Sequence, residues 1–167
     1  IRDNPEDIRS FFFDSWKRSD LIITTGGLGP TTDDITRESI AEAFGEKLVF
    51  DPTIELALKE RFSQLGRPMP ENNLRQCYRP ENAEVLQNPF GTAPGLLLQK
   101  DGKMLVMLPG PAREMHPMFE QVVVPRLQKE GLFPEIDCYI QIRTAGIGES
   151  ALAEKVQHLF EGKESLV

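Results

Sequence analysis

The sequence contains little cysteine and has no long apolar run. Its two cysteines, Cys77 and Cys138, stand far apart among 167 residues and lack Cys-x-x-Cys spacing, so we expect two free thiols rather than a disulfide framework or a metal knuckle. No run approaches the ~20 apolar residues that cross a bilayer, and no signal-peptide pattern opens the chain. We therefore expect a cytoplasmic protein without a membrane partner.

Basic residues are also in deficit. Lys and Arg number 19 against 26 Asp and Glu, which gives a net charge of −7. Because such a surface repels a phosphate backbone, general nucleic-acid binding is not expected. A small phosphorylated ligand remains compatible with this charge, since backbone N–H groups and a bound metal ion can hold phosphate inside an acidic protein.

The apolar residues predict strands that alternate with helices. Hydrophobic residues make up 40% of the chain and charged residues 27%, as in ordinary globular domains. The pattern favours an α/β fold, a three-layer α/β/α sandwich with a mostly parallel sheet. Phe133-Pro134-Glu135 is typical of a linker, which predicts an α/β domain over 1–132 and the start of a small α+β subdomain over 133–167. We expect strands at 21–24, 47–50, 83–86, 96–99, 104–108 and 138–144. Helices are expected from Pro5, around Thr36–Phe44, from Pro52, from 112 to about 131 and around Leu152. Pro117 and Pro125 should kink or divide the helix over 112–131.

A loop rich in glycine and threonine follows the first predicted strand. Residues 24–34 read TTGGLGPTTDD and lead into a helix, and a loop between a strand and a helix N-terminus offers free N–H groups to phosphate. The spacing is neither GxGxxG nor GxxxxGK[ST], and a purely structural turn is the alternative. Binding is favoured, and its candidate residues are Thr25, Gly26, Gly27, Gly29 and Thr32.

Two adjacent carboxylates close this loop. Asp33 and Asp34 can simply complement the dipole of the helix that we expect them to open. Next to a phosphate loop, however, carboxylates are also the hard oxygen ligands of Mg²⁺. Both readings stay open on this pattern alone.

Residues 24–36 resemble the signature loop of CinA-type competence/damage-inducible proteins. Two further segments agree: Gly91-Thr92-Ala93-Pro94-Gly95 resembles the family's GTAPG turn, and residues 108–115 resemble its loop with LPG followed by P, E and M. The wider superfamily includes molybdopterin adenylyltransferases and gephyrin-like G domains, on whose motif Asp34 rather than Asp33 matches the functional aspartate. The resemblance thus adds four binding candidates, which are Gly91, Thr92, Pro109 and Gly110.

This resemblance implies an activity and its requirements. CinA-type domains are linked to metal-dependent hydrolysis of the pyrophosphate bond of ADP-ribose, whereas their relatives bind or adenylylate molybdopterin; a non-catalytic binding module is the third possibility. The implied cofactor is a divalent metal, Mg²⁺ or a transition metal such as Co²⁺, linked to Asp34, with Asp33 as its catalytic neighbour. A homo-oligomer, most simply a dimer, is also implied. The resemblance also implies a strand with a glycine–aspartate–glutamate loop, a helix and another strand ahead of the point where this chain begins, so we expect the sheet to be incomplete.

Overall fold

The computed structural model describes residues 3–132 and 144–157. The chain divides into two compact units, Ile1–Phe133 and Pro134–Val167. The second unit contains one described helix, α6 (Glu149–Val156). The strand predicted over 138–144 falls almost entirely outside the described residues. All that follows concerns the first unit.

A four-stranded mixed sheet forms the centre of the first unit. Its strands, in spatial order, are β1 (Leu21–Thr25), β6 (Lys103–Leu108), β5 (Gly95–Lys100) and β4 (Glu84–Leu86). β1 runs parallel to β6. The two short, buried apolar runs at 21–24 and 104–108 predict that these strands are parallel neighbours in one sheet. β5 is antiparallel to both β6 and β4. The prediction of a mostly parallel sheet is therefore wrong.

A tight hairpin explains the mixed topology. Asp101 and Gly102 join β5 to β6, and both have positive φ values, 54° and 75°. This backbone is that of the two-residue turns that match strand twist, and Asp-Gly is a preferred sequence for them. β6 consequently returns beside β5 directly, without the helical crossover that a parallel pair requires.

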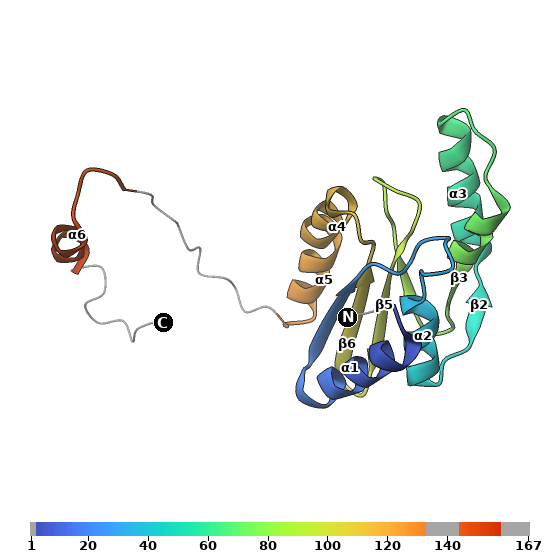
Figure 1. The fold of residues 1–167 in the computed structure, drawn as a ribbon, viewed down its shortest axis with the longest axis horizontal. Coiled ribbons are helices and arrows are strands. Elements are labelled where there is room, and N and C mark those ends of the chain that lie inside the picture. The colour runs from blue at the N-terminus through green and yellow to red at the C-terminus, as the bar shows by residue number, and fades with distance from the viewer. Residues whose placement is uncertain (1–2, 133–143, 158–167) are drawn as a thin grey trace. The chain divides into compact units, whose positions relative to one another are not determined.

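Helices cover both faces of the sheet, so the three predicted layers are present. α1 (Pro5–Arg18) and α2 (Thr36–Phe44) lie on one face, while α4 (Ala112–Met118) and α5 (Val124–Lys129) lie on the other (Figure 1). The side chains of β5 and β6 alternate between the two cores: Leu96, Leu98, Leu105 and Met107 face α1 and α2, and Leu97, Met104, Val106 and Leu108 face α4 and α5.

Local signals set the ends of these helices. Asn4 caps α1 by accepting hydrogen bonds from the amides of Glu6 and Asp7, with Pro5 at the first helical position. Pro117 lies inside α4, and Pro125 lies near the start of α5. A π-helical turn, η2 (Phe119–Val123), separates the two helices, which agrees with the predicted division of this segment.

A smaller layer flanks α2. It contains β2 (Leu48–Phe50), α3 (Pro52–Gln64), the 3-10 helix η1 (Glu71–Cys77) and β3 (Tyr78–Pro80), and β2 pairs with β3 in an antiparallel sheet. Ile54, Leu58 and the free thiol of Cys77 form its core. Within the described ranges, no helix is both long and apolar enough to pass through a bilayer.

Candidate functional site

The loops that follow β1 and β6 meet at one edge of the sheet. Because these strands are parallel, their carboxyl ends lie at the same edge, where the amide of Gly26 donates a hydrogen bond to the carbonyl oxygen of Leu108 at 2.9 Å. A β-carbon on Gly110 would lie 3.3 Å from the Cα of Gly26. The two loops are therefore in close backbone contact.

The glycines of the first loop are required by its shape. Gly27 has a φ of 68°, in the left-handed region that L side chains disfavour. A β-carbon on Gly27 would lie 2.0 Å from the hydroxyl oxygen of Thr36, and one on Gly29 would lie 2.3 Å from a carboxylate oxygen of Asp34. A larger residue at position 27 would collide with Thr36, and one at position 29 would displace the carboxylate of Asp34.

Asp34 belongs to this loop and does not open the helix. α2 begins at Thr36, and its N-cap residue is Ile35, so the expectation that Asp33 and Asp34 open the helix is wrong. The Oδ2 atom of Asp34 accepts hydrogen bonds from the amide of Thr31 at 2.9 Å and from its hydroxyl at 2.5 Å. This pairing closes the loop on itself, and Asp34 acts there as a local structural acceptor.

Arg75, from η1, holds the same loop from outside. Its guanidinium donates hydrogen bonds to the carbonyl oxygens of Thr31 and Asp34 and pairs with the carboxylate of Glu38 at 3.2 Å. Three contacts from one planar group fix the loop relative to α2. No local sequence pattern predicts this role of Arg75, because its contacts with the loop span more than 40 residues.

Three successive amides of the loop remain available. Within the described residues, the structure records no acceptor for the backbone N–H groups of Gly27, Leu28 and Gly29. Leu28 is only 2% exposed as a whole residue, and its side chain packs in the core. Free N–H groups on a fixed backbone form an anion-binding concavity.

The residues that carry these amides line a cavity of about 280 Å³ between the two loops. Pro30, Gln76 and Glu114 also line it. The site residues named from the sequence that line this cavity are Gly26, Gly27, Gly29, Asp34, Thr92, Pro109 and Gly110.

The remaining named residues lie elsewhere. Thr25 lines another cavity, against α1, which Gly26 and Gly27 also line, and Gly91 lines two neighbouring cavities beside α3. Thr32 and Asp33 are exposed at the outer tip of the loop and line none of these cavities. Asp34 therefore lines the cavity between the two loops, whereas Asp33 does not.

Comparisons with known proteins fit this arrangement. Residues 1–129 match the model of a protein family described as a probable molybdopterin binding domain. The chain belongs to this family. It is also CinA-like, as its three signature segments predict: it is 43% identical to a CinA-like protein of Kosmotoga olearia, over 99% of this chain and 40% of that protein. A CinA-like protein of Dictyoglomus turgidum is likewise 43% identical, over 98% of this chain and 39% of that protein.

A solved structure supports the fold. The crystal structure of the protein CinA of unknown function from Thermoplasma acidophilum is 30% identical and superposes with a TM-score of 0.65, covering 77% of this chain and 72% of that chain. The chain spans about two fifths of the length of the curated CinA-like relatives named above.

Glu114 is the functional candidate that sequence reasoning missed in this CinA-like chain. Glu114 is only 7% exposed and lines the cavity together with Gly110. Its Oε2 atom accepts a hydrogen bond from the side-chain amide of Asn88 at 2.9 Å. A β-carbon on Gly91 would lie 1.7 Å from the same oxygen. The residue was visible in the sequence only as one letter of the LPG-containing segment, where an acid in the first turn of a helix has an ordinary explanation.

The cavity can accept a metal ion only together with a ligand. In the part of the chain that the structure describes, no three His, Cys, Asp or Glu side chains form a metal-binding group. Asp34 and Glu114 are the two carboxylates that line the cavity. Mg²⁺ is commonly held by one or two carboxylates together with substrate phosphates and water, so this donor set fits Mg²⁺ on a phosphorylated ligand and not a self-sufficient metal site.

Proposed function

We propose that the chain binds a phosphorylated, nucleotide-like ligand between its two glycine loops and, with a divalent metal ion, hydrolyses a pyrophosphate bond in it. ADP-ribose is the model substrate. The observation that carries this proposal is the row of amides without a recorded acceptor at Gly27, Leu28 and Gly29, residues that line a cavity which two carboxylates also line. Amides favour an anion there, and carboxylates oppose one unless a cation accompanies it.

The backbone amides, the hydroxyl and the carboxylates of the cavity have different roles in this proposal. The free amides and the amide of Gly110 hold nonbridging phosphate oxygens on a backbone that Arg75 and Thr31 have already fixed, so little ordering is needed when the ligand binds. The hydroxyl oxygen of Thr92 accepts a hydrogen bond from the side-chain amide of Gln76 at 3.4 Å. The hydroxyl proton of Thr92 can therefore be donated to a ligand oxygen. Asp34 and Glu114 would hold the metal ion, which would supply positive charge to neutralise the phosphates. Hydrolysis of ADP-ribose then gives AMP and ribose 5-phosphate.

A second candidate is binding of a phosphorylated pterin such as molybdopterin. The family match over residues 1–129 favours it, because that family is described by molybdopterin binding. The same amides would hold its phosphate. This candidate differs from the first in requiring tight binding without hydrolysis.

The test is a reaction of the full chain with ADP-ribose in the presence of Mg²⁺ or Co²⁺, with AMP measured by chromatography. We expect AMP only when metal is added, and loss of AMP when EDTA is present. Metal-independent release of AMP would contradict the proposed chemistry. Tight binding of a pterin phosphate without any AMP formation would favour the second candidate, and failure to bind either ligand would leave a non-catalytic module.

A further inference from the structure

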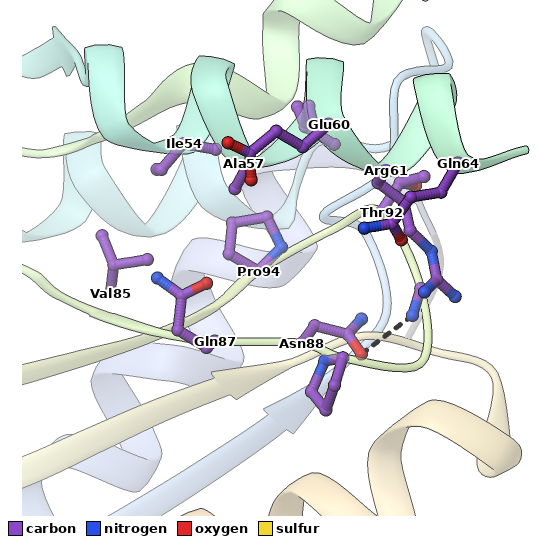
Figure 2. A pocket seen from close by; sticks show the side chains of 13 residues that line it. Ile54, Ala57, Glu60, Arg61, Gln64, Val85, Gln87, Asn88, Thr92 and Pro94 are labelled. Atoms are coloured by element: carbon purple, nitrogen blue, oxygen red, sulfur yellow. Dashed lines mark hydrogen bonds between the residues drawn. The ribbon is translucent and has the colours of Figure 1, made fainter. Parts of the chain in front are cut away.

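The side chain of Asn88 uses every hydrogen-bonding group that it has. Its Oδ1 atom accepts hydrogen bonds from the amides of Phe90 and Gly91, each at 3.0 Å. Its Nδ2 group donates to the carbonyl oxygen of Ala93 at 2.8 Å and to Oε2 of Glu114 at 2.9 Å. A side-chain amide has two acceptor lone pairs and two donor hydrogens, so all four are engaged. Figure 2 shows Asn88 beneath α3, with the bond from the Gly91 amide drawn as a dashed line.

Three of these bonds anchor Asn88 on its own turn. They join the start of the turn to its far end, since Ala93 lies five residues further along the chain. An Asn side chain that takes main-chain partners in this way forms an Asx turn, which holds a short loop in place of regular secondary structure. Asn88 therefore acts on its fourth partner from a fixed position.

The fourth bond crosses to Glu114 in the first turn of α4, 26 residues further along the chain. Glu114 is 7% exposed, and among the described residues Asn88 provides the one side-chain hydrogen bond recorded for its carboxylate. The guanidinium of Arg113 approaches that carboxylate at 3.9 Å, but its side chain is 84% exposed. A buried carboxylate usually pairs with an opposite charge. Here a neutral amide orients the carboxylate instead, and its negative charge stays available to a cation in the cavity that Glu114 lines.

The backbone of the turn also limits where this carboxylate can lie. A β-carbon on Gly91 would lie 1.7 Å from Oε2 of Glu114 and 2.8 Å from Nδ2 of Asn88. Gly91 is not among the glycines with a positive φ, so its backbone conformation suits other residues as well. Glycine is needed at position 91 because the bonded side chains of Asn88 and Glu114 lie against it.

We propose that Asn88 is a positioning residue, which fixes the orientation of the Glu114 carboxylate and keeps its charge free for a metal ion. The proposal rests on the proposed function, because that function gives Glu114 a metal ion to hold. Asn88 does not line the cavity between the glycine loops, so its effect on a ligand must pass through Glu114.

The experiment measures by calorimetry the affinity of the full chain for inorganic pyrophosphate in the presence of Mg²⁺. Asn88→Ser keeps an oxygen that can accept the amides of Phe90 and Gly91, but its side chain is too short to reach Glu114. We expect an affinity about tenfold lower, with a smaller loss at higher Mg²⁺ concentration, because a displaced carboxylate weakens the hold on the metal ion. Glu114→Gln should lower the affinity at least as much. The double variant should be no weaker than Glu114→Gln, because one residue acts through the other.

Two further variants serve as control and confirmation. The side-chain amide of Asn82 donates to both carboxylate oxygens of Glu46 at 2.9 Å, and neither residue lines the cavity. Asn82→Ser therefore breaks the same kind of pair elsewhere and should leave the affinity unchanged. Gly91→Ala keeps Asn88 but pushes the carboxylate of Glu114 aside, so it should reproduce the loss seen with Asn88→Ser. Circular dichroism verifies that each variant folds.

Failure of this inference can be told apart from failure of the proposed function. If Glu114→Gln weakens binding while Asn88→Ser and Gly91→Ala bind like wild type, Asn88 does not position Glu114, and the proposed function stands. If the losses of Asn88→Ser and Glu114→Gln add in the double variant, or do not depend on Mg²⁺, Asn88 supports the fold in general and the inference is wrong. If wild type does not bind pyrophosphate at any Mg²⁺ concentration, the proposed function fails and the inference fails with it.

Discussion

The guanidinium of Arg75 donates a hydrogen bond to the main-chain carbonyl oxygen of Asp34 at 3.3 Å, across 41 residues of sequence. The same guanidinium binds the carbonyl oxygen of Thr31, so η1 and the glycine loop form one unit. Arg75 lines none of the cavities described. It therefore acts as a positioning residue, and its effect on a ligand must pass through the loop.

Replacing Arg75 should weaken binding without removing any group that touches the ligand. Arg75→Gln loses contacts to Thr31, Asp34 and Glu38, so the loop gains freedom that binding must then remove. We expect the affinity for pyrophosphate to fall about tenfold. Hydrogen exchange of the two hydrogen-bonded amides in the loop, those of Thr31 and Asp34, should also become faster. Arg75→Lys keeps the charge but not the planar fork and should be intermediate.

An Arg75→Gln variant with wild-type affinity would contradict this positioning role. Unchanged hydrogen exchange in the loop would contradict it independently. Arg18→Gln is the matched control for the loss of charge, because it removes one positive charge from an exposed position at the end of α1.

Asp34 should matter for turnover more than for stability. Asp34→Asn keeps an oxygen that can accept the hydrogen bonds of Thr31, so thermal unfolding should change little. The charge beside the metal-bound phosphates is lost, which commonly costs roughly 3 kcal/mol of transition-state stabilisation, on the order of a hundredfold in rate. Turnover of ADP-ribose at saturating Mg²⁺ measures the effect.

Asp33→Asn is the neighbouring control. Asp33 is exposed and lines none of the described cavities, so its variant should retain most of the activity. If Asp33→Asn abolished turnover while Asp34→Asn retained it, the assignment would be wrong by one position. Full activity in both variants would rule out a metal role for either residue.

Much of this site could be predicted from local sequence, and the rest depends on distant contacts. The TTGG segment after an apolar strand indicates a loop at a strand end, and parallel pairing of β1 with β6 follows from two similar buried runs. Asp101-Gly102, a two-residue turn between two apolar runs, is a local signal for an antiparallel hairpin, and the prediction of a mostly parallel sheet did not take it into account. Arg75 and Glu114 could not be found in this way, since only the folded chain brings them to the loops.

Asp51 makes the stability of the α3 layer depend on pH. It caps α3 through Thr53 and pairs with Arg79 at 2.6 Å, and hydrogen bonding from Arg79 and then from Thr53 lowers its pKa from 3.8 to about 2. Because the folded-state pKa lies below the ordinary value, the stabilisation is fully present above pH ~4 and disappears as the pH falls through ~2. The shift corresponds to about 2 kcal/mol.

Asp51→Asn should therefore be less stable than wild type by about 2 kcal/mol at pH 7, and the difference should shrink toward pH 2. Urea unfolding at pH 7, 4 and 2.5 measures this. Asp14→Asn, which removes an exposed carboxylate 3.6 Å from Lys17, should change stability by far less. A difference between wild type and Asp51→Asn that stays constant with pH would show that the ion pair with Arg79 is not its origin.

The position of β1 at the edge of the described sheet predicts that this chain associates with a second copy of itself. β1 ends the four-stranded sheet, with β6 as its partner among the described strands, and Ile23 on it is 39% exposed. An edge of this kind is a template for pairing with another copy. We expect light scattering at high micromolar concentration to give the mass of a dimer, and Ile23→Lys to shift it toward monomer. A wild-type chain that remains monomeric at that concentration would contradict this prediction.

The central claim is that the amides of Gly27, Leu28 and Gly29 hold phosphate oxygens, and nuclear magnetic resonance of the ¹⁵N-labelled chain tests it most directly. Inorganic pyrophosphate with Mg²⁺ would be titrated while every resolved amide is followed. An N–H group that gains an anionic acceptor shifts its proton resonance downfield, so these three amides should show the largest saturable downfield shifts, together with that of Gly110. Saturable binding whose shifts lie elsewhere and leave the three amides unchanged would contradict the claim.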